Sequence, residues 1–184
     1  GSPVVPIFHF YDSLAKLANL TEVSKSVQKR ILNKVTANQK KMKKWAHHAQ
    51  MNYLHKFYLV EAERARVLHR EGEARSFYDK AIALAQENKY VNEEALAYEL
   101  AGQFYWAKGQ VKIAYVYLRD AHHAYSRWGA TAKVNELETR YPHILTQNDF
   151  FCPLVLPEKP QIAECQGCNY NKNNTVSTLS ATKP

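Results

Sequence analysis

Residues 51–127 contain two copies of one unit of about forty residues, and this duplication restricts the folds open to the chain. When the sequence is shifted by that period, small residues mostly meet small ones and large apolar residues mostly meet large ones. The matched pairs are Tyr58 with Tyr98, Ala62 with Gly102, Ala65 with Tyr105, Ala74 with Ala114, Tyr78 with Leu118 and Ala81 with Ala121. Such a period is typical of helical hairpins that bury their apolar faces only by stacking on one another.

The second copy follows the tetratricopeptide pattern more closely than the first. Its pattern residues are Tyr98, Ala101, Gly102 and Tyr105, then Ala114, Leu118 and Ala121, with Lys108 and Gly109 as the turn. We predict that Gly102 and Ala114 let two antiparallel helices approach closely, while the tyrosines fill the space beside them. The first copy departs from this pattern at Glu61, and it has His69 where the second copy has its turn glycine.

The apolar spacing predicts seven helices. Their expected ranges are 6–20, 21–49, 52–68, 72–88, 92–108, 110–128 and 130–141. Thr21 and Asn92 are the expected N-caps of the second and fifth helices, and Gly129 is the expected left-handed cap that ends the sixth. The chain begins almost directly on its first helix, so we expect that helix to be the second half of a hairpin whose first half has been cut away.

The predicted fold is all-α: antiparallel helical hairpins stacked as a short tetratricopeptide-like α-solenoid, with an irregular C-terminal tail. We expect residues 1–5 to be an expression scar and lead-in, and residues 6–141 to form the helical-repeat domain. Residues 142–184 are expected to be a mostly irregular tail or linker, because prolines and then Gln, Asn, Ser and Thr dominate them. Residues 142–157 carry enough apolar side chains for partial packing.

The net charge of +8 comes from one part of the chain. Residues 21–56 hold nine lysines and arginines against Glu22 alone, and the remaining sequence balances. A nucleic acid or an anionic surface would therefore have to meet the second helix, where Lys40, Lys41, Lys43 and Lys44 form a candidate basic patch. The alternative is a solvated helix face, neutralised by acidic side chains of neighbouring helices.

Motifs for catalysis and for cofactor binding are absent from the sequence. It has no glycine-rich phosphate loop, no G-x-S-x-G and no H-E-x-x-H. The histidine pairs His47-His48 and His122-His123 are adjacent on helices, where neighbouring side chains diverge by about 100° and do not readily share a metal ion. We therefore predict no enzyme activity and no cofactor for this chain.

The three cysteines, Cys152, Cys165 and Cys168, lie in the tail, and an odd number without a paired framework favours a reducing, cytoplasmic location. With His143, they offer a weak candidate zinc site. No apolar run is long enough to span a membrane.

The leading functional prediction is a non-catalytic scaffold that binds a protein segment or a neighbouring domain of the same chain. In tetratricopeptide geometry the first helix of each hairpin lines the groove. Helix phase then gives these candidate walls: Lys56, Leu59, Glu63, Arg66, Leu96, Glu99, Gln103 and Trp106. The alternative is that the basic helix at 21–49 binds nucleic acid or an anionic surface. The shortened first hairpin is a possible site of homo-oligomerisation.

Residues 41–142 also resemble a known group of proteins. The most specific stretches are Asn52-Tyr53-Leu54-His55-Lys56 and Ala124-Tyr125-x-Arg127-Trp128-Gly129-Ala130. They are similar to the helical-repeat region of large cyanobacterial signalling kinases, which join a serine/threonine-kinase-like domain, an AAA-type ATPase module, this helical region, a GAF domain and a histidine kinase. The resemblance implies a segment of a signal-transduction kinase whose catalytic domains lie outside these residues.

Overall fold

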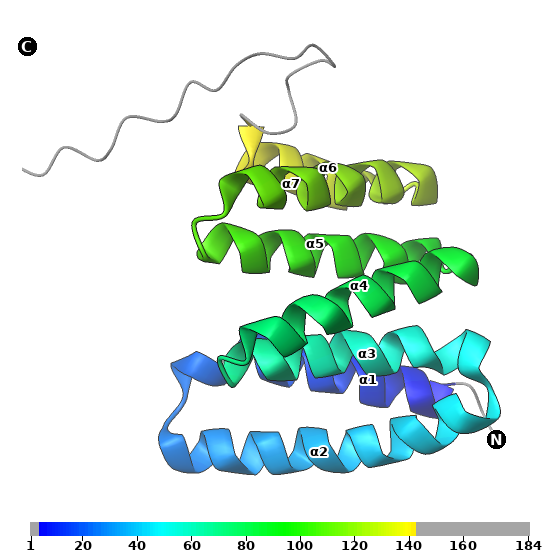
Figure 1. Cartoon of the computed structure of the whole chain (residues 1–184), viewed down its shortest axis with the longest axis vertical. Coiled ribbons are helices and arrows are strands. Elements are labelled where there is room, and N and C mark those ends of the chain that lie inside the picture. The colour runs from blue at the N-terminus through cyan, green and yellow to red at the C-terminus, as the bar shows by residue number, and fades with distance from the viewer. Residues whose placement is uncertain (1–3, 143–184) are drawn as a thin grey trace, which may run out of the picture. The chain divides into compact units, whose positions relative to one another are not determined.

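The computed structural model describes residues 4–142, and the regular elements in that range are all helices (Figure 1). They are α1 (Val4–Ala18), the 3-10 turn η1 (Leu20–Glu22), α2 (Lys25–His48), α3 (Gln50–Val67), α4 (Glu71–Glu87), α5 (Val91–Ala107), α6 (Val111–Trp128) and α7 (Thr131–Arg140). The predicted all-α class is confirmed. Proline is absent between Pro6 and Pro142, so the ring that breaks helix interiors is missing throughout this range.

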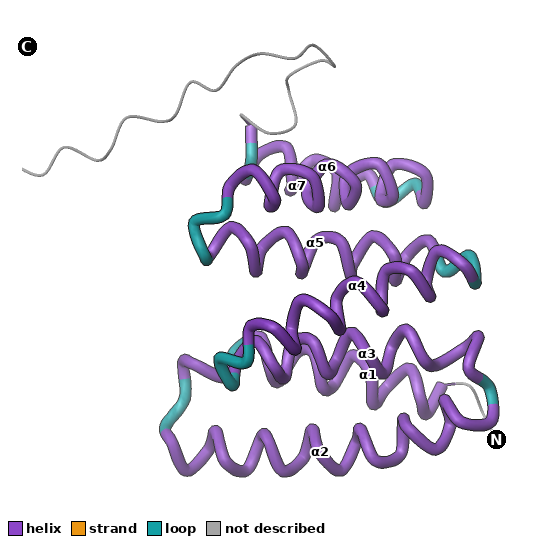
Figure 2. The backbone as a smooth tube through the Cα atoms, viewed as in Figure 1, coloured by secondary structure: helices purple, strands orange, loops and turns teal. Residues whose placement is uncertain are grey.

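Successive helices pack as hairpins that stack on one another. The hairpins are α1 with α2, α3 with α4, and α5 with α6, while α1 also contacts α3 and α3 contacts α5. The first helices of the three hairpins therefore succeed one another through the stack, and the backbone tube shows the short loops that join them (Figure 2). Helix α2 lies at one edge of the stack, where its neighbours are α1, η1 and α3 (Figure 1).

The structure corrects the expected place of the first helix. Helix α1 pairs with α2 and packs on α3, so it is the first helix of a hairpin and not the second half of one. Buried Phe10 and Leu17 face this packing. The reason given for expecting self-association, a hairpin with its partner helix missing, therefore no longer applies.

Four consecutive turns between helices share one geometry and recur every twenty residues. The residues with positive φ are His69 (58°), Lys89 (61°), Gly109 (69°) and Gly129 (81°). In each turn the following residue donates its N–H to the carbonyl five positions earlier, as in a Schellman motif. These bonds join Arg70 to Ala65, Tyr90 to Ala85, Gln110 to Tyr105 and Ala130 to Tyr125, with N···O distances of 2.9 to 3.0 Å. The left-handed cap predicted at Gly129 is confirmed, and His69 adopts the conformation of its glycine counterpart.

Two predicted helix starts are wrong for the same physical reason. Residues 20–22 form the turn η1, so α2 begins later, after Ser24 and not after Thr21. Helix α5 begins after Tyr90, whose carbonyl accepts the Glu94 N–H at 2.8 Å, and Asn92 lies inside the helix. In both places the backbone turn sets the first helical residue, and the side chain of the N-cap makes no capping bond.

Small residues bring the two repeated hairpins together as predicted. Ala62, Ala74, Ala101 and Ala114 are all fully buried in the main core. In α5, Gly102 lies directly against Leu118 of α6. Tyr105 stacks on Tyr117 with ring centroids 5.2 Å apart, and the ring of Tyr98 is tilted against that of Tyr117 with centroids 6.2 Å apart.

Candidate functional site

The eight predicted groove residues lie at very different depths. Lys56, Leu59, Glu63 and Glu99 are buried, Arg66, Leu96 and Gln103 are partly exposed, and Trp106 is 43% exposed. The polar members contact other side chains, and these contacts form three clusters among helices α3 to α7. That the eight residues bind a partner remains a prediction, and Trp106 is the member with the most surface to offer.

The first cluster, the Lys56 cluster, consists of His55, Lys56, Tyr90 and Glu93. The Lys56 ammonium lies 3.1 Å from a Glu93 carboxylate oxygen, and both side chains are buried. It also donates to His55 Nε2 at 2.9 Å and lies 4.2 Å from the centre of the Tyr90 ring, which stacks on His55. Because an ammonium group only donates, His55 Nε2 must accept, which fixes a neutral imidazole with its proton on Nδ1.

Burial controls the charge states in this cluster. It lowers the pKa of His55 to about 3, together with the neighbouring Lys56 charge, which is the smaller cause. Burial also lowers the pKa of Lys56 from its ordinary value, while the Glu93 carboxylate opposes that shift. The result is one buried ion pair beside a neutral histidine, held between the starts of α3 and α5.

The second cluster, the Glu63 cluster, joins α3 to α4. The Arg66 guanidinium donates to the Glu63 carboxylate from Nε at 3.0 Å and from Nη2 at 2.7 Å. The Tyr78 hydroxyl, from the buried face of α4, donates to the same carboxylate. Burial and the Glu63 charge raise the pKa of Tyr78 well above its ordinary value, so the hydroxyl remains a donor.

The third cluster, the Glu99 cluster, joins α5, α6 and α7. The buried Glu99 carboxylate accepts from the Tyr125 hydroxyl at 2.6 Å, from Lys133 Nζ at 2.9 Å and from Gln103 Nε2 at 3.1 Å. Two predicted groove residues, Glu99 and Gln103, are therefore in direct contact. Burial and the Glu99 charge raise the pKa of Tyr125.

These three clusters are suited to structural roles. Each central carboxylate is met by a cation, and two of the three also accept a tyrosine hydroxyl. The second oxygen of Glu93 is buried and has no hydrogen-bond partner among the described residues. Within residues 4–142, no group of three or more His, Cys, Asp or Glu side chains is arranged to hold a metal ion. The candidate zinc residues Cys152, Cys165, Cys168 and His143 lie outside the described residues.

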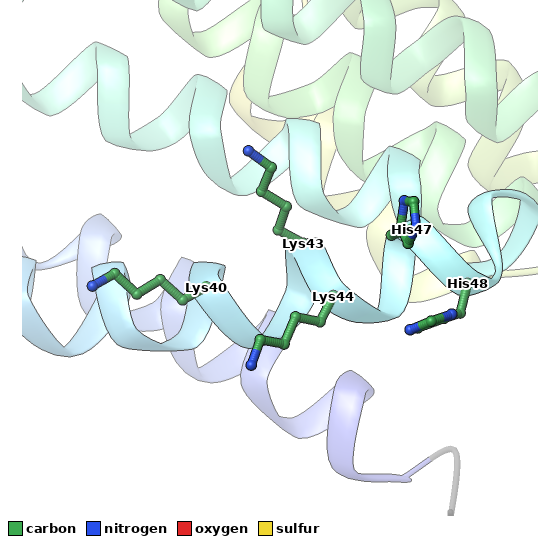
Figure 3. A pocket seen from close by; sticks show the side chains of 5 residues that line it. All are labelled: Lys40, Lys43, Lys44, His47 and His48. Atoms are coloured by element: carbon green, nitrogen blue, oxygen red, sulfur yellow. The ribbon is translucent and has the colours of Figure 1, made fainter.

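The predicted basic patch is part of a longer cationic surface. This lysine face consists of Lys25, Lys29, Arg30, Lys34, Lys40, Lys41, Lys43 and Lys44, all exposed on α2. Lys40, Lys43 and Lys44, with His47 and His48, surround an open hollow of about 520 Å³ (Figure 3). Among residues 4–142, no carboxylate forms an ion pair with any member of the lysine face. Direct ion pairs within residues 4–142 therefore do not neutralise this helix. Although burial opposes the shift, hydrogen bonds from Lys16 and Asn38 and the charges of Lys16 and Lys34 lower the pKa of Asp12 in α1, so one neighbouring carboxylate does interact with this face.

Sequence reasoning missed several polar partners. Glu93 in α5 was not linked to Lys56 in α3, yet the two form a buried ion pair. Tyr78 was assigned to packing alone, and Tyr125 and Lys133 were not singled out as ligands of a carboxylate. These partners lie 15 to 37 positions apart in the sequence, and no local pattern marks such pairs.

Comparison with known proteins gives one partial relative. A stretch of 66 residues, 36% of this chain, is 41% identical to the hybrid signal transduction histidine kinase G of Dictyostelium discoideum. The match spans only 2% of the length of that protein. No family model and no solved structure matches the chain.

The relative agrees with part of the resemblance found in the sequence. The chain is similar to a region of a signal-transduction histidine kinase, and no catalytic domain is evident in it. The relative is not cyanobacterial, so this match does not support the cyanobacterial part of the resemblance. None of the helices within residues 4–142 combines the length and the hydropathy needed to cross a bilayer.

Proposed function

We propose that this chain is a non-catalytic scaffold module of a cytoplasmic signal-transduction protein. In this proposal residues 6–141 are a tetratricopeptide-like repeat domain that contacts a protein segment or a neighbouring domain of the same chain. Residues 142–184 are a linker. Any kinase activity of the parent protein resides in other domains.

The observation that carries the proposal is the repetition of the turns. Four identical turns at intervals of twenty residues set successive helices at regular positions, and regular helical arrays offer extended surfaces for other polypeptides. The partial similarity to a histidine kinase supports a signalling context. The neutralised carboxylates of the three clusters favour a rigid framework over a reaction centre.

The contact surface is proposed to centre on Trp106 at the end of α5. Its ring is 43% exposed and lies edge-on to Tyr141, with centroids 5.3 Å apart. Partly exposed Leu96 and Gln103 lie earlier on the same helix. Exposed tryptophan is among the residue types that most often dominate protein interfaces.

Affinity capture with the full chain as bait tests this function. Trp106→Ala should lose a specific partner that the wild-type chain retains, and the purified partner should bind the variant at least about tenfold more weakly. Trp128→Ala is the matched control, because Trp128 is 54% exposed at the end of α6 and is not among the predicted groove residues. Arg66 is unsuitable as a probe, because replacing it would strip the buried Glu63 of its cation. Equal affinity of wild type and Trp106→Ala would refute the proposed surface.

A second role, binding of an anionic partner by residues 21–49, is favoured by one observation. The lysine face carries eight cations that form no ion pair with the described part of the chain, on a helix whose own sequence contains no acidic residue. Steep loss of binding with added salt is the expected signature of such a role. Binding that does not change with ionic strength would exclude it.

A further inference from the structure

We infer that the lysine face of α2 binds flat against the surface of anionic lipid bilayers. This one face of the module would thereby attach it to a membrane. The inference rests on the second role proposed above and names its partner. It is independent of the surface around Trp106.

The first argument is the contrast between α2 and the other helices. Basic side chains elsewhere mostly pair with carboxylates, as Lys108 does with Glu71 and Arg127 with Glu94. Within residues 4–142 the lysine face has no such ion pair along a helix of 24 residues, a length of about 36 Å. Repulsion among these charges is unfavourable for the free chain and is relieved when an anionic surface binds.

The second argument is the shape of this surface. Helix α2 is at the edge of the stack and contacts α1, η1 and α3 on its buried side, where Val35, Met42 and Ala46 face the core (Figure 1). Its cations cover the opposite side, where Lys40, Lys43 and Lys44 border an open hollow and not an enclosed cleft. A planar bilayer can reach cations along the whole length of this side.

The third argument is the chemistry of the cations. Seven of the eight are lysines, which act as flexible point charges, and only Arg30 has the planar fork that recognises carboxylates in a bidentate manner. Lipid phosphates and phosphatidylserine headgroups are mobile and suit such point charges. The exposed side of α2 lacks the row of aromatic side chains on which single-stranded bases stack, because its one aromatic residue other than histidine, Trp45, is partly buried and stacks on His9.

The fourth argument is an exposed apolar side chain beside the basic segment. Phe8 in α1 is 63% exposed, and its ring lies against His9, with centroids 5.8 Å apart. His9 stacks on Trp45, directly after Lys43 and Lys44 in α2. Val5, one turn earlier in α1, is also exposed. Basic residues next to exposed apolar ones are typical of helices that bind at the boundary between lipid headgroups and acyl chains.

Vesicle co-sedimentation of the full chain tests this inference. The probes are vesicles of phosphatidylcholine alone and vesicles with about 30% phosphatidylserine, at low and at near-physiological salt. The wild-type chain should bind the serine-containing vesicles only, and added salt should weaken the binding. A variant with Lys40, Lys41, Lys43 and Lys44 all changed to Gln should bind at least about a hundredfold more weakly, since each lysine near a bilayer contributes roughly fivefold and four such factors multiply.

A second variant controls for net charge. Changing Arg70, Lys89, Lys112 and Arg140 to Gln removes the same charge from exposed positions outside α2 and should reduce binding far less. Phe8→Ser should weaken vesicle binding without changing its salt dependence. Circular dichroism of each variant confirms that the helices remain.

Three results would overturn the inference. One is the absence of binding to serine-containing vesicles, and another is an equal loss in both charge variants. The third is tight binding of α2 to duplex RNA or DNA under conditions where vesicles are not bound, which would assign the lysine face to nucleic acid. None of these results changes the capture of a protein partner through Trp106, so the scaffold role and the membrane role fail separately.

Discussion

Gly102 and Leu118 are in such close contact that the space between α5 and α6 has no room for a methyl group. A Cβ atom on Gly102 would lie 2.7 Å from Cγ of Leu118 and 3.2 Å from its backbone nitrogen. The leucine atom is a branch point near the backbone, so it cannot swing away as the end of a long side chain could. Gly102 therefore sets the distance between the two helices of the second repeat.

We predict that Gly102→Ala destabilises the fold by about 1 to 3 kcal/mol, because overpacking outweighs the gain of about 1 kcal/mol in helix propensity. Urea unfolding followed by circular dichroism measures the change. Gly72→Ala is the matched control, since no atom lies within 4 Å of its added Cβ, and it should leave stability unchanged or raise it slightly. Equal effects of the two substitutions would contradict the close packing.

The four repeated turns predict that introducing a glycine and removing one, at equivalent turn positions, change the stability in opposite directions. Lys89→Gly should stabilise the chain by about 0.5 to 1 kcal/mol, because glycine adopts positive φ without the steric penalty of a side chain. Gly109→Ala should destabilise it by about 1 kcal/mol, although open space surrounds the added Cβ. Unfolding free energies measure both changes. If both substitutions raised the unfolding free energy, or both lowered it, the two turns would differ in geometry.

The buried ion pair of Lys56 and Glu93 predicts that the stability cost of replacing either residue depends strongly on whether the other is present. Lys56→Met alone should cost about 3 kcal/mol or more, because it leaves a buried carboxylate without its cation. Adding Glu93→Leu should recover most of that loss. Arg70→Met is the surface control, because Arg70 and Glu73 are 3.7 Å apart and exposed, and it should cost less than about 1 kcal/mol. A double-mutant cycle with no coupling between Lys56 and Glu93 would exclude the pair.

His55 predicts a loss of stability in acid. Its pKa is about 3 in the folded chain and near 6.5 when unfolded, so the unfolded state binds a proton that the folded state excludes. Its contribution is complete above pH 6.5 and decreases as the pH falls towards 3, by up to about 1.4 kcal/mol per pH unit. His55→Gln should flatten the stability curve in this window. Urea unfolding at several pH values measures this slope, and a slope that His55→Gln leaves unchanged would contradict the buried neutral imidazole.

Local patterns predicted most of the fold. The forty-residue period, the small residues at Ala62, Ala74 and Ala114, and the helix ends at Gly109 and Gly129 depend on residues close together in sequence or on one repeated unit. Those features are confirmed. The expected caps at Thr21 and Asn92 are wrong, because the backbone turn, and not a capping side chain, determines which residue begins each helix.

The place of the first helix and the polar clusters could be found only from the three-dimensional structure. Whether α1 begins or ends a hairpin depends on its contact with α3, which no periodicity within residues 4–18 encodes. Helix phase assigned Lys56 and Glu63 to a groove wall, but stacking of the next helix buries them against Glu93 and Tyr78. The lysine face was predictable, because its eight charges all lie within residues 25–44, where no acidic residue occurs.

Hydrogen exchange of the full chain, with and without its captured protein partner, tests the scaffold role most directly. The account predicts slow exchange throughout α3 to α6 in the free chain, and added protection in the second half of α5 around Trp106 when the partner binds. The Trp106→Ala variant should show the slow exchange without the added protection. Partner binding that leaves exchange within residues 4–142 unchanged would contradict the proposal that this helical array is an interaction surface.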